Sequence, residues 1–151
     1  MRQLWRLAVS ERATPAGIGG SVAVGVFAGC TPFVGFHWAI AVAAASVLRL
    51  NRLWALVGSR ISFFLILPWI VLAEVQTAHR LRTGGWAPLL SANAIDHAPE
   101  WMLDWCLGTL PVGIALAATL GFVAYAVASL RENVRRRAPA PAPPPSSGSL
   151  P

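Results

Sequence analysis

One stretch of sequence decides the fold of this chain, and it reads Cys30-Thr31-Pro32-Phe33-Val34-Gly35. It interrupts residues 16–48, a run of 33 positions without a charged side chain. As one straight helix this run would measure about 50 Å, well beyond the ~30 Å hydrocarbon core of a bilayer. Because Pro32 and Gly35 break helices, we expect two short helices, over 17–29 and 36–48. They should form a broken or re-entrant hairpin that returns the chain to the side on which it entered.

The composition of the whole chain predicts an integral membrane protein. Of the 151 residues, 56% are hydrophobic and only 12% are charged, and the mean hydropathy is +0.59. A soluble domain carries about 25% charged residues, so a water-facing surface could hardly be built here. The length suits one domain. We expect an all-α membrane helical bundle over residues 16–137.

Two further apolar segments predict membrane-spanning helices. Residues 53–75 and 107–130 are each long enough to cross a bilayer. Pro68 should kink the first, and Pro111 should be tolerated in the first turn of the second. Residues 76–106 between them are expected to form an external loop. Within that loop Pro99 should open a short helix that carries Trp101 and Trp105 at the membrane interface.

The arginines predict the orientation. The chain has twelve Arg and no Lys against six acidic residues, a net charge of +6. Nine of the Arg flank the apolar segments on one side of the expected topology, namely Arg2, Arg6, Arg12, Arg49, Arg52, Arg131, Arg135, Arg136 and Arg137. The positive-inside rule makes that side, with both termini, cytoplasmic in a multi-pass protein of a bacterial inner membrane. Because the Arg flank apolar runs and form no stripe on a soluble fold, we expect no nucleic-acid partner.

The two ends of the chain differ from its centre. Residues 1–15 suit an amphipathic segment in the membrane interface. At its end, Thr14 and Pro15 are expected to be the N-cap and the first residue of the next helix. A lipoprotein cleavage box ending at Cys30 is disfavoured because the apolar character continues past it, so we expect an uncleaved N-terminus. Residues 138–151 are rich in Pro, Ala and Ser and should form a disordered tail.

Small residues recur at four-residue spacing in two of the expected helices. One row is Gly17, Ser21, Gly25 and Gly29, and the other is Gly113, Ala117 and Gly121. Such a face lets two helix backbones approach closely in lipid. We expect these rows to pack within the bundle, and a homo-oligomer interface is the alternative.

The helix break also suggests a binding site. A half-helix that begins after Gly35 would point free N–H groups and a positive dipole end into the membrane. If Arg60 turns inward, then Thr31, Gly35, His37 and Arg60 could border one polar site for an anionic group. Alternatively, His37 is a hydrogen-bonded residue of the turn and Arg60 extends to the headgroups. Pro32, Gly35 and Pro68 are the expected structural breaks.

No catalytic constellation is visible in the sequence. Cys30 and Cys106 lie far apart and form no metal-binding spacing, so buried free thiols are the simplest expectation. Glu74, Asp96, Glu100 and Asp104 fall at or outside one expected membrane face. We therefore expect neither an enzyme nor a metal or other cofactor.

The break motif resembles a known bacterial family. The run Gly25-Val26-Phe27-Ala28-Gly29-Cys30-Thr31-Pro32-Phe33-Val34-Gly35-Phe36-His37, followed by Leu48-Arg49-Leu50-Asn51, is similar to the signature of the membrane family called domain of unknown function 2062. The resemblance covers roughly residues 15–137. The family usually has an Asn-Pro pair after Ser in the third apolar segment, whereas here Ser62 is followed by Phe63. The resemblance implies a membrane protein with a helix break and supplies no substrate.

Two functions from different classes fit these observations. The first is a small transporter or flippase-like protein for an anionic, lipid-like substrate bound at the break. The second is a membrane scaffold that acts through helix contacts and its Pro-rich tail. In both, the lipid bilayer is the principal partner, joined in the second by another copy or another membrane protein.

Overall fold

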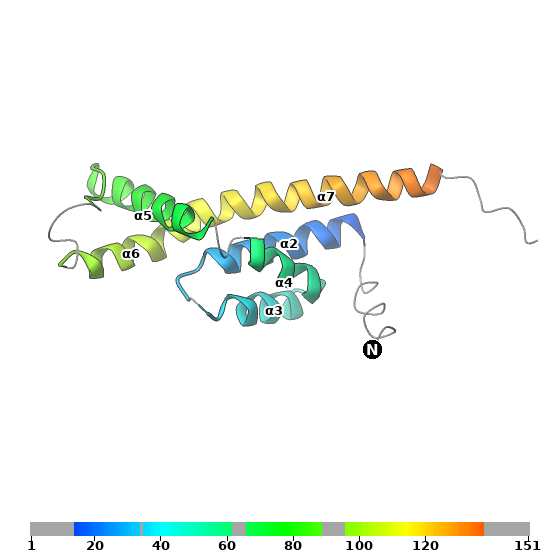
Figure 1. The fold of residues 1–151 in the computed structure, drawn as a ribbon, viewed down its shortest axis with the longest axis horizontal. Coiled ribbons are helices and arrows are strands. Elements are labelled where there is room, and N and C mark those ends of the chain that lie inside the picture. The colour runs from blue at the N-terminus through cyan, green and yellow to red at the C-terminus, as the bar shows by residue number, and fades with distance from the viewer. Residues whose placement is uncertain (1–13, 34, 62–65, 89–95, 138–151) are drawn as a thin grey trace, which may run out of the picture.

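The computed structural model describes residues 14–33, 35–61, 66–88 and 96–137, and all regular structure there is helical. The expected all-α class is thus confirmed. The elements in chain order are α2 (Pro15–Cys30), α3 (His37–Val47), α4 (Arg52–Ile61), α5 (Leu67–Thr83), α6 (Ala98–Gly108), the π-helical segment η1 (Thr109–Gly113) and α7 (Ile114–Arg137). In Figure 1, α2 lies along α7, and α3 and α4 lie beside α2. Helices α5 and α6 form the end of the molecule that is far from the C-terminal end of α7.

The hairpin breaks where the proline and glycine predict. Thr14 caps α2, because its hydroxyl oxygen accepts the N–H of Gly17 at 3.1 Å, and a proline occupies the first turn. At the other end Thr31 has an extended backbone. Gly35 adopts a φ of +90°, a conformation that glycine reaches without strain. The helices are 16 and 11 residues long, so each is too short to span a bilayer comfortably.

The expected single helix over 53–75 is wrong. Helix α4 ends at Ile61, Ile66 is a bend, and α5 begins at Leu67. Pro68 lies in the first turn of this new helix, where its missing N–H is harmless. It therefore starts a helix where a kink was expected. Residues 62–65, which include Ser62 and Phe63, lie outside the described residues.

The expected external loop and last helix also differ from the structure. Residues 76–106 include the second half of α5 and most of α6, and Pro99 opens α6 as predicted. Helix α6 continues through η1 into α7, a single helical rod of 40 residues from Ala98 to Arg137. Pro111 is therefore not in a first turn, because it lies within the π segment. A proline ring collides with the preceding turn of a regular α-helix, and the wider π turn relieves that conflict.

Close backbone contacts hold α2 between α4 and α7. A Cβ on Gly25 would overlap the carbonyl oxygen of Ala55, and a Cβ on Gly58 would be 2.6 Å from the carbonyl oxygen of Val22. On the α7 side, a Cβ on Gly121 would be 2.7 Å from that of Ala23. The buried members of both small-residue rows thus lie at contacts within the chain. Backbone proximity of this kind favours van der Waals packing between helices.

Asn51 fastens the hairpin to α4. It is only 4% exposed, its N–H donates to the Ser21 hydroxyl at 2.9 Å, and its side-chain oxygen accepts the N–H of Leu53 at 2.9 Å. It therefore caps the start of α4 and satisfies N–H groups that the helix itself cannot pair. The Asn that ends the run Leu48-Arg49-Leu50-Asn51 is a structural residue of the helix turn.

One helix in the described part of the chain is long and apolar enough to cross a membrane. It is the rod Ala98–Arg137, whose most apolar window has a mean hydropathy of 2.0 and is 17% buried. The core helix of a soluble protein would be mostly buried. Large apolar side chains are exposed along α7, among them Ile114, Phe122, Val127 and Leu130. The described residues thus contain one candidate spanning helix, where the sequence predicted two.

Candidate functional site

The helix break encloses a small pocket between α3 and α4. Its volume is about 180 Å³, and it is lined by Gly35, His37, Trp38, Ser59 and Arg60. Three of the four residues predicted to share a site, Gly35, His37 and Arg60, therefore border one cavity. A water molecule occupies ~30 Å³ of liquid, so the cavity has room for a small oxyanion with some of its hydration.

Thr31, the fourth predicted residue, does not line the pocket. Its hydroxyl donates to the carbonyl oxygen of Ala28 at 2.7 Å, and its own carbonyl oxygen accepts from Nε2 of His37 at 2.9 Å. His37 is 3% exposed. The imidazole therefore ties the end of α2 to the first turn of α3, as the structural interpretation of His37 expects. Thr31 acts through this hydrogen bond and not as a pocket wall.

The pocket lies at the positive end of α3. Phe36 precedes the helix and supplies no side-chain cap to its first N–H groups. Such an end carries about half a positive charge. Arg60, in the last turn of α4, adds a full positive charge to the same cavity. The electrostatic field of the pocket therefore favours an anion.

Ser59 and Trp38 are pocket residues that sequence reasoning missed. Ser59 is buried, and its hydroxyl donates to the carbonyl oxygen of Leu56 in its own helix at 2.8 Å. Gly25 contacts Ala55 and Ser59 closely, and this contact fixes how near this part of α4 lies to α2. The small residues Gly58 and Ser59 indicate a close helix contact in the sequence. Only the crossing of α2 and α4 shows which cavity lies beside them.

A second polar cluster lies between α5 and α6, and the sequence did not predict it. Asp104 is fully buried, and its carboxylate accepts from His79 Nδ1 at 2.8 Å and from Arg82 Nε at 3.0 Å. His79 and Arg82 lie three residues apart on one face of α5, which was the only sequence signal. The pairing compensates the burial of the Asp104 carboxylate and joins the two helices.

Glu74 contrasts with Asp104. It too is fully buried, but neither carboxyl oxygen has a hydrogen-bond partner within the described ranges. Trp105 and Thr109 lie nearby without the geometry of a hydrogen bond to it. The backbone of Glu74 packs against Gly108, immediately before η1, where a Cβ would be 2.8 Å from the Glu74 Cα. The tight helix crossing therefore holds this carboxyl in place.

The two cysteines have different environments. Cys30 is buried at the end of α2, whereas Cys106 is exposed on α6. The expectation of two buried thiols is therefore wrong for Cys106. Its position on the outward face of α6 follows from which face packs on α5, and the sequence does not encode that directly.

Comparison with known proteins identifies the family. The model of the family described as "Uncharacterized protein conserved in bacteria (DUF2062)" matches residues 1–137, and the chain belongs to this family. The resemblance of the break motif is thus confirmed. No curated protein and no solved structure matches the chain. The family description names neither an activity nor a location.

Proposed function

We propose that this DUF2062 protein is a multi-pass protein of the bacterial inner membrane that binds an anionic group at the break between α2 and α3. It would act as a small carrier or flippase-like protein for an anionic, lipid-like substrate. The observation that carries this proposal is the shared pocket of Gly35, His37 and Arg60 at the uncapped start of α3.

The dimensions of the α6–α7 rod support a membrane location. From Thr109 to Arg131 the helix rises about 33 Å, close to the thickness of the hydrocarbon core. Arg131, Arg135, Arg136 and Arg137 follow, as expected at a cytoplasmic face. Thr14 and Arg135 line one pocket, so the start of α2 and the end of α7 lie at the same end of the molecule. This supports a cytoplasmic location for both chain ends.

The break lies at the outer edge of the proposed span, where an anionic headgroup could reach it. Thr109 donates a hydrogen bond to the carbonyl oxygen of Cys30 at 3.3 Å, so the end of α2 is level with the start of the proposed span. Irregular backbone at membrane depth is tolerated where protein buries it or where it lines a polar cavity. Arg60 is exposed beside the break, where its charge can meet an anionic lipid headgroup.

A carrier is better supported than the scaffold or an enzyme. The small-residue faces contact helices of the same chain, so Gly25, Gly58 and Gly121 are not available as a homo-oligomer interface. The Pro-rich tail, on which docking would depend, lies outside the described residues. We propose binding and movement of a substrate, because the positive charge of the pocket suits an anionic ligand.

Lipid movement in reconstituted vesicles tests the proposal. Full-length protein in phosphatidylcholine vesicles should accelerate transbilayer movement of fluorescent phosphatidylglycerol more than that of fluorescent phosphatidylcholine. Arg60→Gln should slow the phosphatidylglycerol rate about tenfold, which corresponds to the loss of one charged hydrogen bond. Arg52→Gln is the matched control, since Arg52 is on the same helix but does not line the pocket. Rates equal to those of protein-free vesicles, or equal losses in the two variants, would refute the carrier.

A further inference from the structure

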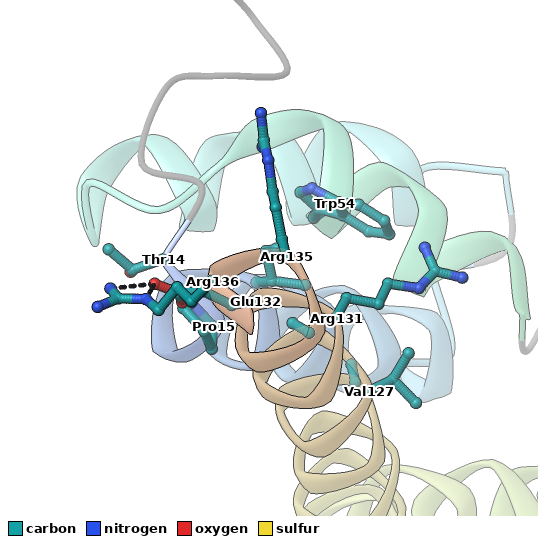
Figure 2. Close-up of a pocket in the computed structure, with 11 residues that line it drawn as sticks. Thr14, Pro15, Trp54, Val127, Arg131, Glu132, Arg135 and Arg136 are labelled. Carbon is teal, nitrogen blue, oxygen red and sulfur yellow. Dashed lines mark hydrogen bonds and ion pairs between the residues drawn. The ribbon is translucent and has the colours of Figure 1, made fainter. Parts of the chain in front are cut away.

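A second, larger pocket lies at the other end of α2. It measures about 940 Å³ and is formed by the start of α2, by Trp54 of α4 and by the last turns of α7. Figure 2 shows Arg136 and Glu132 beside Thr14 and Pro15, and Arg131 and Arg135 on the side of Trp54. Helix α2 rises about 22 Å between Pro15 and Cys30, so this pocket is distinct from the one at the break.

The pocket combines an apolar wall with a basic rim. Ile18, Trp54 and Val127 contribute apolar surface. Three arginines and one glutamate supply the charge, which leaves the rim with an excess of two positive charges. The start of α2 adds the positive end of a helix dipole. A ligand that satisfies both parts must be amphiphilic, with an anionic head and an apolar body.

The arginines differ in their availability. Arg136 is paired with Glu132, with Nε 3.0 Å from the carboxylate oxygen. Arg131 and Arg135 make no ion pair with any residue that the structure describes. They are four residues apart and so project from the same face of α7. In Figure 2 they extend on either side of Trp54, so the rim offers two separate guanidinium groups, each of which can bind phosphate oxygens through paired N–H donors.

We propose that this pocket binds the phosphate headgroup of an anionic phospholipid. Arg131 and Arg135 would hold the phosphate, and the acyl chains would lie on the exposed apolar surface of α7 around Val127 and Leu130. Basic pockets between helices at a cytoplasmic face are suited to such headgroups. The site rests on the proposed membrane location but not on transport, so it would stand even if the carrier function failed.

Two other occupants fit the pocket less well. Free phosphate would fill only a small part of 940 Å³ and would gain nothing from the apolar wall. Residues 1–13 of the chain carry Arg2, Arg6 and Arg12 against Glu11, a positive charge of the same sign as the rim. Like charges repel, so charge complementarity favours the lipid over this segment.

Equilibrium lipid binding tests the proposal without any transport. Full-length protein in neutral detergent is titrated with short-chain phosphatidylglycerol, short-chain phosphatidylcholine and inorganic phosphate. Phosphatidylglycerol should bind most tightly, and R131Q/R135Q should weaken it about tenfold or more. The control R52Q/R137Q removes the same charge from arginines outside the pocket and should change affinity less than about twofold. All four arginines are exposed, so the variants should fold.

Three outcomes would overturn the assignment. Inorganic phosphate that binds as tightly as phosphatidylglycerol would show a phosphate site. Equal losses in the two double variants would show unspecific attraction to a basic surface. A photo-reactive residue at Val127 that cross-links to residues 1–13 or to a second copy, and not to the lipid, would give the pocket a different occupant. Weaker phosphatidylglycerol binding in Trp54→Ala, with unchanged binding of inorganic phosphate, would support the apolar wall.

Discussion

Gly25 of α2 lies so close to the carbonyl oxygen of Ala55 in α4 that no side chain fits between them. A Cβ at this position would also be 2.9 Å from the backbone nitrogen of Ser59. Because the opposing atoms belong to a helix backbone, they cannot rotate away. This contact fixes the crossing of α2 and α4 and thereby the place of Arg60 beside the break.

Gly25→Ala should therefore destabilise the protein, by about 2 kcal/mol or more, because overpacking forces two backbones apart. Gly20→Ala is the matched control in the same helix. Its Cβ would be 3.5 Å from a Leu50 side-chain carbon, an ordinary contact, and alanine has the better helix propensity by up to ~1 kcal/mol. Thermal unfolding in one detergent, followed by far-UV circular dichroism, compares them. Equal melting temperatures would contradict the close contact.

Asp104→Asn should destabilise the α5–α6 pair. The substitution keeps the shape of the side chain but removes the negative charge that pairs with Arg82 and accepts the hydrogen bond from His79. We expect a loss of about 2 kcal/mol, moderated because the Arg82 side chain is partly exposed. Glu132→Gln breaks an exposed Glu–Arg pair and should cost less than about 1 kcal/mol. Similar melting temperatures for the two variants would show that the buried cluster contributes little.

Glu74→Gln should act in the opposite direction from Asp104→Asn. Both carboxyls are fully buried, but Glu74 lacks a hydrogen-bond partner in the described part of the chain. Above neutral pH the buried carboxyl is charged, and an amide of similar shape removes this unfavourable charge, so the variant should be more stable by about 1 kcal/mol. The measurement is the melting temperature at about pH 8.5. A lower value for Glu74→Gln would mean that the carboxyl makes a stabilising interaction.

Cysteine labelling tests the proposed topology. In a background with Cys30→Ala and Cys106→Ser, cysteines at Arg52 or Ser146 should resist an impermeant reagent added outside intact cells. A cysteine at exposed Asp96, between α5 and α6, should react. Arg52 is preferred to Asn51 because Asn51 is buried and caps α4. Labelling at Arg52 or Ser146 from outside would contradict the cytoplasmic location of both ends.

The sequence by itself determined the local features of this protein. The apolar runs predicted helices, Thr14 and Pro15 marked the start of α2, and the proline and glycine of residues 30–35 marked the end of one helix and the start of the next. These features depend on backbone sterics and on hydrogen bonds within a few residues. The same local rules gave the wrong prediction for two prolines. Pro68 started a new helix, and Pro111 was absorbed in a π turn within a continuous rod.

Only the tertiary structure decided which distant residues meet. Nothing in the spacing of Arg60 and His37 fixes the face of α4 that turns toward the break. That choice follows from the contact of Gly25 with Ala55 and of Gly58 with Val22. The way the helices cross also decides that Asp104 pairs with His79 and Arg82. It likewise decides that Trp54 and Arg131 line the same pocket. Helix crossings are set by the summed packing of whole faces, so the sites appear only once the helices are assembled.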